Sequence, residues 1–390
     1  MGRPHVRRSA LKPLVILGAT GSIGRQAVEV AERIGVPIAA MAAKTGSDAL
    51  LRLANAHPEA AVCVVEPGDA ASAFREELGD RVHFGDGAIT EAAAIEDVTV
   101  LNAIVGAAGL EASLAALYAG NRLALANKES MVAGGSLVLA ALKDGGGELI
   151  PVDSEHAAIF QCIAGSSSRD IARLILTASG GPFRGMNRSE LEAVTVAETL
   201  AHPTWQMGPR ITTDSATLMN KAFEVIEAHF LFGVPFDAIA VTVHPQSVIH
   251  SFVEFVDGIV TAEVGFPDMR KPIQMAITHP ERIAVDHAPL DLVGTDLTFE
   301  APDHETFPCL ALGYEAGRAG GTAPAVLNAA DEVAVAAFLD GVIPFLAIAS
   351  IVAEVLTRHE PTTPESVAEV LEADDWARSE ARSAVQKASD

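Results

Sequence analysis

The chain has few cysteines, few aromatic residues and no long apolar run. Its three cysteines, Cys63, Cys162 and Cys309, lie far apart without a C-x-x-C pair, which argues against a disulfide framework or a zinc site. They indicate buried or free thiols in a reducing compartment, so we expect a cytoplasmic protein. Because no apolar run is long enough to span a bilayer, we expect no membrane partner.

Basic residues are also scarce: 27 Lys and Arg stand against 51 Asp and Glu, a formal net charge of −24. This excess of acid argues against a nucleic-acid partner, because phosphate backbones are bound by surplus Lys and Arg. Any anionic ligand must therefore meet a local cationic pocket. With 49% hydrophobic and 20% charged residues, the composition is that of a globular protein.

The N-terminal stretch "MGRPHVRRSALK" is basic, as in a secretion signal, but the apolar run after it is short and broken by Gly18 and Gly21. We therefore expect a tail that leads into a strand, without a cleaved signal. Val6 stands where N-myristoylation requires Ser or Thr, so lipidation is not expected.

The 390 residues predict roughly two or three domains. From residue 14 to about 150, short apolar runs alternate with helical stretches, which predicts an α/β fold with a doubly wound, Rossmann-like parallel sheet over 1–150. The predicted strands are 14–17, 38–42, 60–65, 98–104, 122–126 and 148–152.

The remainder of the chain has a different pattern. Residues 151–278 predict an α/β domain with a mixed sheet, because strands flank a hairpin signal at Asp257-Gly258. Residues 279–308 have weak periodicity and are interpreted as a linker. Residues 309–390 predict a C-terminal helical domain with Pro and Gly at the joints.

The first βα turn, "LGATGSIG", carries Gly18, Gly21 and Gly24. Small residues there allow a tight turn, and the N–H groups of the following helix can face a pyrophosphate, so the turn predicts a dinucleotide site. NAD-preferring sites carry an acid after the second strand, whereas this chain has Lys44 and Thr45. A cation at that point favours NADP; a solvated lysine is the alternative.

Two polar stretches follow. In "PVDSEH", Asp153 and Glu155 point to one side if the preceding strand continues, and a solvated acidic turn is an equal alternative. In "TTDSATLMNKAFEVIEAHFLF", Asp214 and Ser215 predict the N-cap of one amphipathic helix. Met219, Phe223, Ile226 and Phe230 form its apolar face, whereas Asn220, Glu224 and Glu227 form a stripe that, taken alone, is typical of a solvent-exposed face.

Several of these residues suit phosphate and metal. Ser215, Asn220 and Lys221 offer the donors that a phosphate needs. Oxygen ligands without paired Cys or His favour Mg²⁺ or Mn²⁺ over zinc. Further polar groups lie in "LANKES", "TASGGPFRG" and "HPTWQMG", which contain Asn127, Lys128, Glu129, Ser179, His202, Trp205 and Met207.

Together these motifs resemble the 1-deoxy-D-xylulose 5-phosphate reductoisomerase family. The resemblance rests on "GATGSIG", "AIVGAAGL", "LANKES", "PVDSEH", "SGGPFR", "HPTWQMG", "DSATLMNK", "HPQSVIHS", "PDMRKPI" and "LNAADE", and so covers nearly the whole chain. Two departures are Ala43-Lys44-Thr45, where the family commonly has Gly-Lys-Asn, and Ala157, where many members have Asn.

The resemblance implies a site for NADPH, a divalent cation and a sugar phosphate. It implies that NADPH is bound by Thr20, Gly21, Ser22, Ile23, Ala43, Lys44, Thr45, Asn127, Glu129 and Gly208. It implies that Mn²⁺ or Mg²⁺ is bound by Asp153, Glu155 and Glu224. It implies that the substrate contacts Lys128, Ser154, Glu155, Ser179, His202, Ser215, Asn220, Lys221 and Glu224, with Trp205 over its carbon chain.

The implied reaction rearranges 1-deoxy-D-xylulose 5-phosphate and reduces it to 2-C-methyl-D-erythritol 4-phosphate, a step of non-mevalonate isoprenoid synthesis. Lys128, Asp153, Glu155, His202, Trp205 and Glu224 would be its catalytic residues, and a homodimer is expected. One alternative is an NADP-linked dehydrogenase of the aspartate-semialdehyde type, which needs a nucleophilic cysteine. The other is a non-catalytic NADP-sensing module.

Residues 179–209 have site residues at both ends, and Gly180, Gly181 and Gly185 near the start. This pattern suggests a lid that closes over substrate, with Trp205 exposed before closure. A surface excursion whose glycines serve turns is the alternative.

Overall fold

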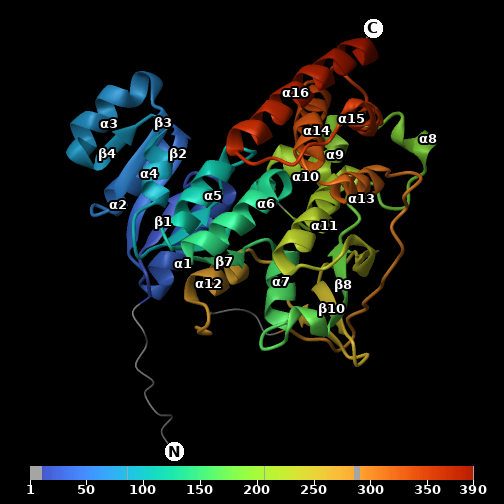
Figure 1. Cartoon of the computed structure of the whole chain (residues 1–390), viewed down its shortest axis with the longest axis horizontal. Coiled ribbons are helices and arrows are strands. Elements are labelled where there is room, and N and C mark those ends of the chain that lie inside the picture. The colour runs from blue at the N-terminus through green and yellow to red at the C-terminus, as the bar shows by residue number, and fades with distance from the viewer. Residues whose placement is uncertain (1–10, 86, 206, 285–289, 390) are drawn as a thin grey trace, which may run out of the picture. The chain divides into compact units, whose positions relative to one another are not determined.

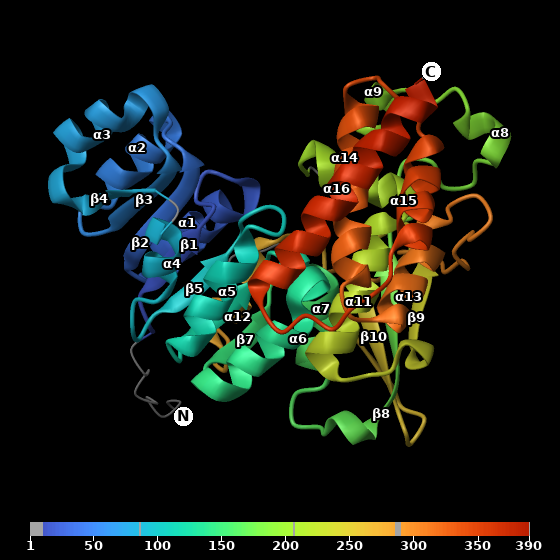
Figure 2. The ribbon, with the colours of Figure 1, turned by 45° about the horizontal axis from the view of Figure 1, so that its top comes forward.

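The structure is a computed structural model that describes residues 11–85, 87–205, 207–284 and 290–389. The chain forms two compact units, and Figures 1 and 2 show the elements of each. The first unit holds residues up to 127, 141–152 and 268–287; the second holds 128–140, 153–267 and 288 onward. The N-terminal stretch through residue 10, which the sequence predicts to be a tail, lies outside the described residues.

The first unit contains a parallel sheet in the order β4-β3-β2-β1-β5-β6-β7. This confirms the predicted doubly wound α/β fold. The short strand β4 was missed by the sequence analysis. The strands are β1 (Leu14–Leu17), β2 (Ile38–Thr45), β3 (Ala61–Glu66), β4 (Val82–Phe84), β5 (Thr99–Asn102), β6 (Arg122–Leu125) and β7 (Glu148–Pro151).

Helices cover both faces of this sheet. The order of the strands reverses at β1, so right-handed crossovers place the helices before and after the reversal on opposite faces. Helix α1 packs against α12, and α4 packs against α5. The helices are α1 (Ser22–Ile34), α2 (Asp48–Ala56), α3 (Ala71–Leu78), α4 (Gly87–Ala93), α5 (Gly109–Tyr118), α6 (Lys128–Gly145) and α12 (Arg270–Thr278), and α6 begins in the second unit.

The glycine-rich turn after β1 needs its glycines for space. Gly18 has a φ of +84°, and a Cβ there would lie 2.5 Å from the main-chain oxygen of Ala103. A Cβ on Gly24 would lie 2.2 Å from the oxygen of Gly18. The turn is therefore as tight as a dinucleotide-binding turn requires.

The second unit contains a mixed sheet in the order β11-β10-β8-β9, in which only β8 and β9 are parallel among the described strands. Its strands are β8 (Ile171–Ala178), β9 (Ile239–Val243), β10 (Ile249–Phe255) and β11 (Val260–Val264). The hairpin predicted at Asp257-Gly258 joins β10 to β11 and is confirmed. Helix α7 (Ser154–Cys162) packs on β10 and β11, and α11 (Met219–Phe232) packs near β8 and β9.

The stretch predicted as one helix from Asp214 is two helices. Helix α10 (Pro209–Thr217) contains Asp214 and Ser215 in its body, so neither residue is an N-cap. The break falls at Leu218, which adopts a left-handed φ of 64° between α10 and α11. The apolar face of α11 is confirmed, because Met219, Phe223 and Ile226 are buried in the core.

The C-terminal helices lie side by side in the same unit, with α14 against both α15 and α16 (Figures 1 and 2). They confirm the predicted helical character of residues 309–390 and share a core with α11. The segment before them has no helix among its described residues and pairs once with β9, between Glu300 and Val243. The helices are α13 (Cys309–Ala319), α14 (Ala323–Leu339), α15 (Ala347–Arg358) and α16 (Val367–Ser389).

Within the described residues, none of the helices combines the length and apolar character needed to cross a membrane.

Candidate active site

Three acidic side chains of the second unit converge on one point. Asp153 is the N-cap of α7, Glu155 lies in the first turn of that helix, and Glu224 lies in α11. One oxygen from each carboxylate lies within 4.8 Å of the others. The sequence alone left a solvated acidic turn open, and this convergence favours the site.

The way in which Asp153 and Glu155 meet differs from the expectation. Strand β7 ends at Pro151, so the two residues do not alternate along a strand. Instead, the Asp153 side chain accepts a hydrogen bond at 3.2 Å from the main-chain N–H of Glu155 and caps α7. The first turn of the helix brings both carboxylates together.

Two lysines lie among these carboxylates: Lys221 is buried, and the side chain of Lys128 is 12% exposed. The Nζ atom of Lys128 lies 3.1 Å from Asp153 Oδ2 and 3.2 Å from Glu224 Oε1. It also donates to Asn220 Oδ1 at 2.6 Å. The Nζ atom of Lys221 contacts Glu224 Oε2 and lies 3.7 Å from Glu155 Oε1. The structure therefore groups Lys128, Asp153, Glu155, Asn220, Lys221 and Glu224, and Ser154 joins them through a 2.8 Å hydrogen bond to Glu155.

The pKa values reflect a strongly charged, buried site. Burial opposes the ionisation of Asp153, but Lys128, His156 and Lys221 hold its pKa well below the usual range. Burial, together with repulsion from Glu224 and Asp153, raises the pKa of Glu155 to about 8 against the pull of Lys221. Burial disfavours the charged form of Lys128, yet Asp153 and Glu224 raise its pKa well above normal. A divalent cation fits this donor set, because its positive charge would offset the mutual repulsion of the three carboxylates.

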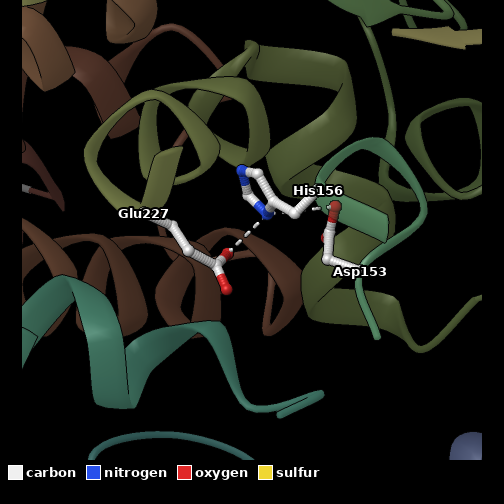
Figure 3. A group of neighbouring side chains, drawn as sticks. All are labelled: Asp153, His156 and Glu227. Atoms are coloured by element: carbon white, nitrogen blue, oxygen red, sulfur yellow. Dashed lines mark ion pairs between the residues drawn. The ribbon is translucent and has the colours of Figure 1, made fainter. Parts of the chain in front are cut away.

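His156 and Glu227 form a buried pair next to Asp153. Figure 3 shows His156 of α7 between Asp153 and Glu227 of α11. Burial lowers the pKa of His156, but the charges of Glu227 and Asp153 outweigh it and raise the pKa to about 9. The stripe formed by Asn220, Glu224 and Glu227 is therefore not a solvent face, since both glutamates are buried.

Three predicted substrate residues form a second polar group around His202. Its Nε2 atom lies 3.0 Å from Ser179 Oγ and 3.1 Å from Ser215 Oγ. Its Nδ1 atom accepts hydrogen bonds from the main-chain N–H groups of Thr204 and Trp205, so Nε2 carries the proton. Burial lowers the pKa of His202, which keeps the ring neutral. A neutral donor with two hydroxyls is suited to binding an anionic oxygen.

Trp205 is half-buried in this structure, rather than fully exposed as the lid hypothesis expected, and its ring lies 6.4 Å from that of His250. Two short helices precede it, α8 (Arg188–Leu191) and α9 (Val196–Thr199). The next residue, 206, lies outside the described part of the chain.

The predicted NADPH residues of the first unit surround the glycine-rich turn. Gly21 is the N-cap of α1, and Ser22 and Ile23 start that helix after Thr20. No described side chain caps this helix end, and its first turn carries no acid, so its N–H groups suit a pyrophosphate. Ala43, Lys44 and Thr45 end β2, where Lys44 pairs with Glu66 across 3.4 Å.

Asn127, another predicted NADPH residue, is buried and has a structural task. Its side-chain amide donates to the main-chain oxygens of Ile104 at 2.7 Å and Gly106 at 3.0 Å. It therefore holds the loop that follows β5. Glu129 and Gly208 belong to the second unit, and their contact with NADPH stays a prediction.

Sequence reasoning missed a largely buried arginine that pairs with Glu129. Arg210, in the first turn of α10, lies 3.0 Å from Glu129 Oε1 and 2.7 Å from Glu332 Oε1. It also donates to Asn328 Oδ1 at 2.7 Å. The motif "LNAADE", to which no role was assigned, supplies Asn328 and Glu332, and this was the available signal.

Comparison with known proteins decides the family. Models of 1-deoxy-D-xylulose 5-phosphate reductoisomerase match residues 14–135 and, for its C-terminal domain, residues 149–232; a further model of the DXP reductoisomerase C-terminal domain matches residues 264–380. A 1-deoxy-D-xylulose 5-phosphate reductoisomerase of Xanthomonas campestris is 50% identical over 382 residues, covering 95% of this chain and 96% of the relative. The chain belongs to this family.

Solved structures of the reductoisomerase family agree. The reductoisomerase from Zymomonas mobilis in complex with NADPH is 40% identical with a TM-score of 0.89, covering 96% of this chain and 99% of its own. A DOX-P reductoisomerase structure with NADPH, fosmidomycin and magnesium is 38% identical with a TM-score of 0.88, covering 96% of this chain and 98% of its own. The resemblance seen in the motifs is thus confirmed.

The cysteines argue against the dehydrogenase alternative. Cys309 is buried, and burial raises its thiol pKa far above normal. Burial also raises the pKa of Cys162. Neither is the activated thiolate that a semialdehyde dehydrogenase requires.

Proposed function

We propose that this chain is the NADPH- and divalent-metal-dependent enzyme that converts 1-deoxy-D-xylulose 5-phosphate into 2-C-methyl-D-erythritol 4-phosphate. It acts in the synthesis of isoprenoid precursors and is both an isomerase and an oxidoreductase. The observation that carries the proposal is the convergence of Asp153, Glu155 and Glu224 with Lys128 and Lys221 in a buried site. An NADP-sensing module would have no use for such a site.

Asp153, Glu155 and Glu224 would hold the ion, Mg²⁺ or Mn²⁺. When bound, the ion would polarise the substrate carbonyl as a Lewis acid, and NADPH would supply the hydride. Lys128 lies between two of these carboxylates and can donate to a substrate oxygen. Ser154 sits beside Glu155, where it can donate to the same substrate.

The phosphate end of the substrate would be bound by Ser179, Ser215, Asn220 and Lys221. The neutral His202 joins the two serines and keeps both hydroxyls in place. Trp205 would cover the carbon chain of the substrate and exclude water.

NADPH would be bound by the turn at Thr20–Ile23, by Ala43, Lys44 and Thr45, and by Asn127, Glu129 and Gly208. We propose residues 1–150 as the cofactor-binding domain, 151–278 as the catalytic domain, 279–308 as a linker and 309–390 as a C-terminal helical domain. The tight turn after β1 supports the first assignment.

We also propose a cytoplasmic homodimer. The three cysteines are free thiols, as in a reducing compartment. Strand β11 is the edge of the mixed sheet, and exposed apolar residues, Val256, Ile259, Val260, Val264 and Phe266, lie along the hairpin and just after it. A second copy that pairs with this edge would cover them.

The experiment that tests the function is metal-dependent oxidation of NADPH by the purified protein with 1-deoxy-D-xylulose 5-phosphate. Glu224→Gln should lower turnover by orders of magnitude while the affinity for NADPH hardly changes, because one ligand of the ion is lost. Glu365→Gln, which alters an exposed glutamate, is the matched control. An active Glu224→Gln variant with an unaltered metal titration would refute the assignment.

A further inference from the structure

His156 and Glu227 are an acid–imidazole pair that the proposed reaction does not use. The side chains are 0% and 1% exposed, so they cannot contact solvent or a substrate directly. They come from α7 and α11, the two helices that carry the three predicted metal ligands. Their burial needs an explanation, since charged groups are rarely placed in a core without a role.

The ring of His156 connects two of those ligands. Its Nε2 atom lies 2.9 Å from the main-chain oxygen of Glu224 and must donate to it, because a carbonyl can only accept. Its Nδ1 atom lies 3.1 Å from Glu227 Oε2 and 3.5 Å from Asp153 Oδ1. Figure 3 shows the ring between the two carboxylates, with Glu227 opposite Asp153.

We propose that Glu227 is a positioning residue that acts through His156 on the metal ligand Asp153. Glu227 fixes the rotation of the imidazole, and the imidazole in turn fixes Asp153 relative to the main chain of Glu224. Ligands on two separate helices are thereby kept at the spacing that the ion needs. This inference rests on the proposed function, because it assumes the metal site.

Asp153, His156 and Glu227 also lie close enough together to be metal ligands themselves. Exposure favours the positioning role. The side chains of Asp153 and Glu155 are 13% and 15% exposed, so an ion from solvent can reach the site that they form with Glu224. The side chains of His156 and Glu227, by contrast, are not accessible to solvent. Moreover, Nε2 of His156 is already used on a carbonyl, and Nδ1 faces Glu227 Oε2 at 3.1 Å.

The test measures Mn²⁺ binding without turnover, by the electron paramagnetic resonance signal of the free ion, and NADPH binding by its fluorescence. Glu227→Gln keeps the shape of the side chain but removes its charge. We expect it to weaken Mn²⁺ binding by about 10-fold or more, the usual effect of losing an outer-shell partner, and to leave NADPH binding unchanged. His156→Gln should do the same, and the double variant should lose little more, because both residues act in one chain of contacts.

His229→Gln is the matched control, since it alters a histidine of α11 that bonds to Val234 instead. Loss of Mn²⁺ binding in Glu227→Gln and His156→Gln but not in His229→Gln supports the proposal. It is overturned if both variants bind Mn²⁺ like the wild type, even where they melt early, since the pair would then serve only packing. It is also overturned if the wild type binds two ions and Glu227→Gln binds one. A wild type that binds no Mn²⁺ would instead refute the metal site itself.

Discussion

The lysines of the proposed site differ in burial, and burial determines how strongly their charges act. Lys128 and Lys221 are enclosed with Asp153, Glu155 and Glu224, where carboxylates raise their pKa values although burial opposes the charge. They remain cationic and can meet the anionic substrate within a strongly acidic protein. Lys44, by contrast, has a side chain that is 74% exposed, so its charge is screened by solvent.

Lys44 should nevertheless select the cofactor, because it ends β2 where NAD enzymes carry an acid. Lys44→Asp is expected to raise the KM for NADPH far more than the KM for NADH. Steady-state kinetics with both cofactors will measure this. Glu66→Gln, which removes the ion-pair partner of Lys44, should change neither KM. Equal effects of Lys44→Asp on both cofactors would show that Lys44 is a surface residue only.

The residues proposed to contact ligands were more predictable than those that support them. Asp153, Glu155 and Glu224 could be named from motifs. This held even though the site joins distant parts of the chain, since Lys128 and its partner Glu224 are 96 positions apart. Arg210 and Glu227 could not be named, because a charge on a helix is usually solvated and nothing local reveals its partner. Arg210 meets Asn328 and Glu332, 118 and 122 positions further along the chain.

At the scale of elements, apolar runs predicted most strands, whereas the predicted boundaries of the helices that carry the site residues were wrong. Strand β4 is only three residues long, too short for its pattern to be recognised. The break between α10 and α11 falls at Leu218, whose left-handed backbone no nearby Gly or Pro announces. Tertiary packing sets that break, and it separates Ser215 from Asn220 and Lys221.

The structure anchors much of the segment 179–209 that the sequence suggests as a lid. Phe183 packs edge-on against Phe345, and Leu191 belongs to the hydrophobic core. Capping boxes at Asn187 and Thr195 bind main-chain N–H groups in the first turns of α8 and α9. Such anchors restrict motion, so we propose that any closure over substrate is confined to the stretch that carries His202 and Trp205.

We therefore expect the fluorescence of Trp205 to change when a phosphonate inhibitor is added with metal and NADPH, because the half-buried ring would become enclosed. Trp376 of α16 is the internal control, since its ring lies against that of His359, with the centroids 5.0 Å apart. Trp205→Ala should weaken inhibitor binding and turnover without lowering the melting temperature. A variant that melts early but keeps its turnover would mean that Trp205 only packs.

For the molecule as a whole, the acidic excess extends into the interior. Asp214 of α10 and Asp331 of α14 are buried close to Arg210, at 3.7 Å and 4.0 Å from its guanidinium nitrogens. Burial raises the pKa of Asp214 to about 6, although Arg210 opposes the shift. Burial and repulsion from Asp214 raise the pKa of Asp331 well above normal. The fold thus favours protonated carboxyls here.

This pair should make the protein less stable as pH rises. An unfolded aspartate has an ordinary pKa of 3.8, whereas the fold raises the pKa of Asp214 to about 6. Between these values the unfolded chain binds fewer protons, so the free energy of unfolding falls with rising pH. Asp331→Asn removes one of the two titrating carboxyls and should flatten this fall. At pH 7 the melting temperature of this variant should be the same as that of the wild type or a few degrees higher. Calorimetry from pH 4 to pH 7 will measure both effects.

Asp237→Asn, which alters an exposed aspartate paired with Arg318, is the control and should leave the pH dependence unchanged. A marked loss of stability at pH 7 in Asp331→Asn would mean that Asp331 is ionised in the fold and that Arg210 depends on its charge.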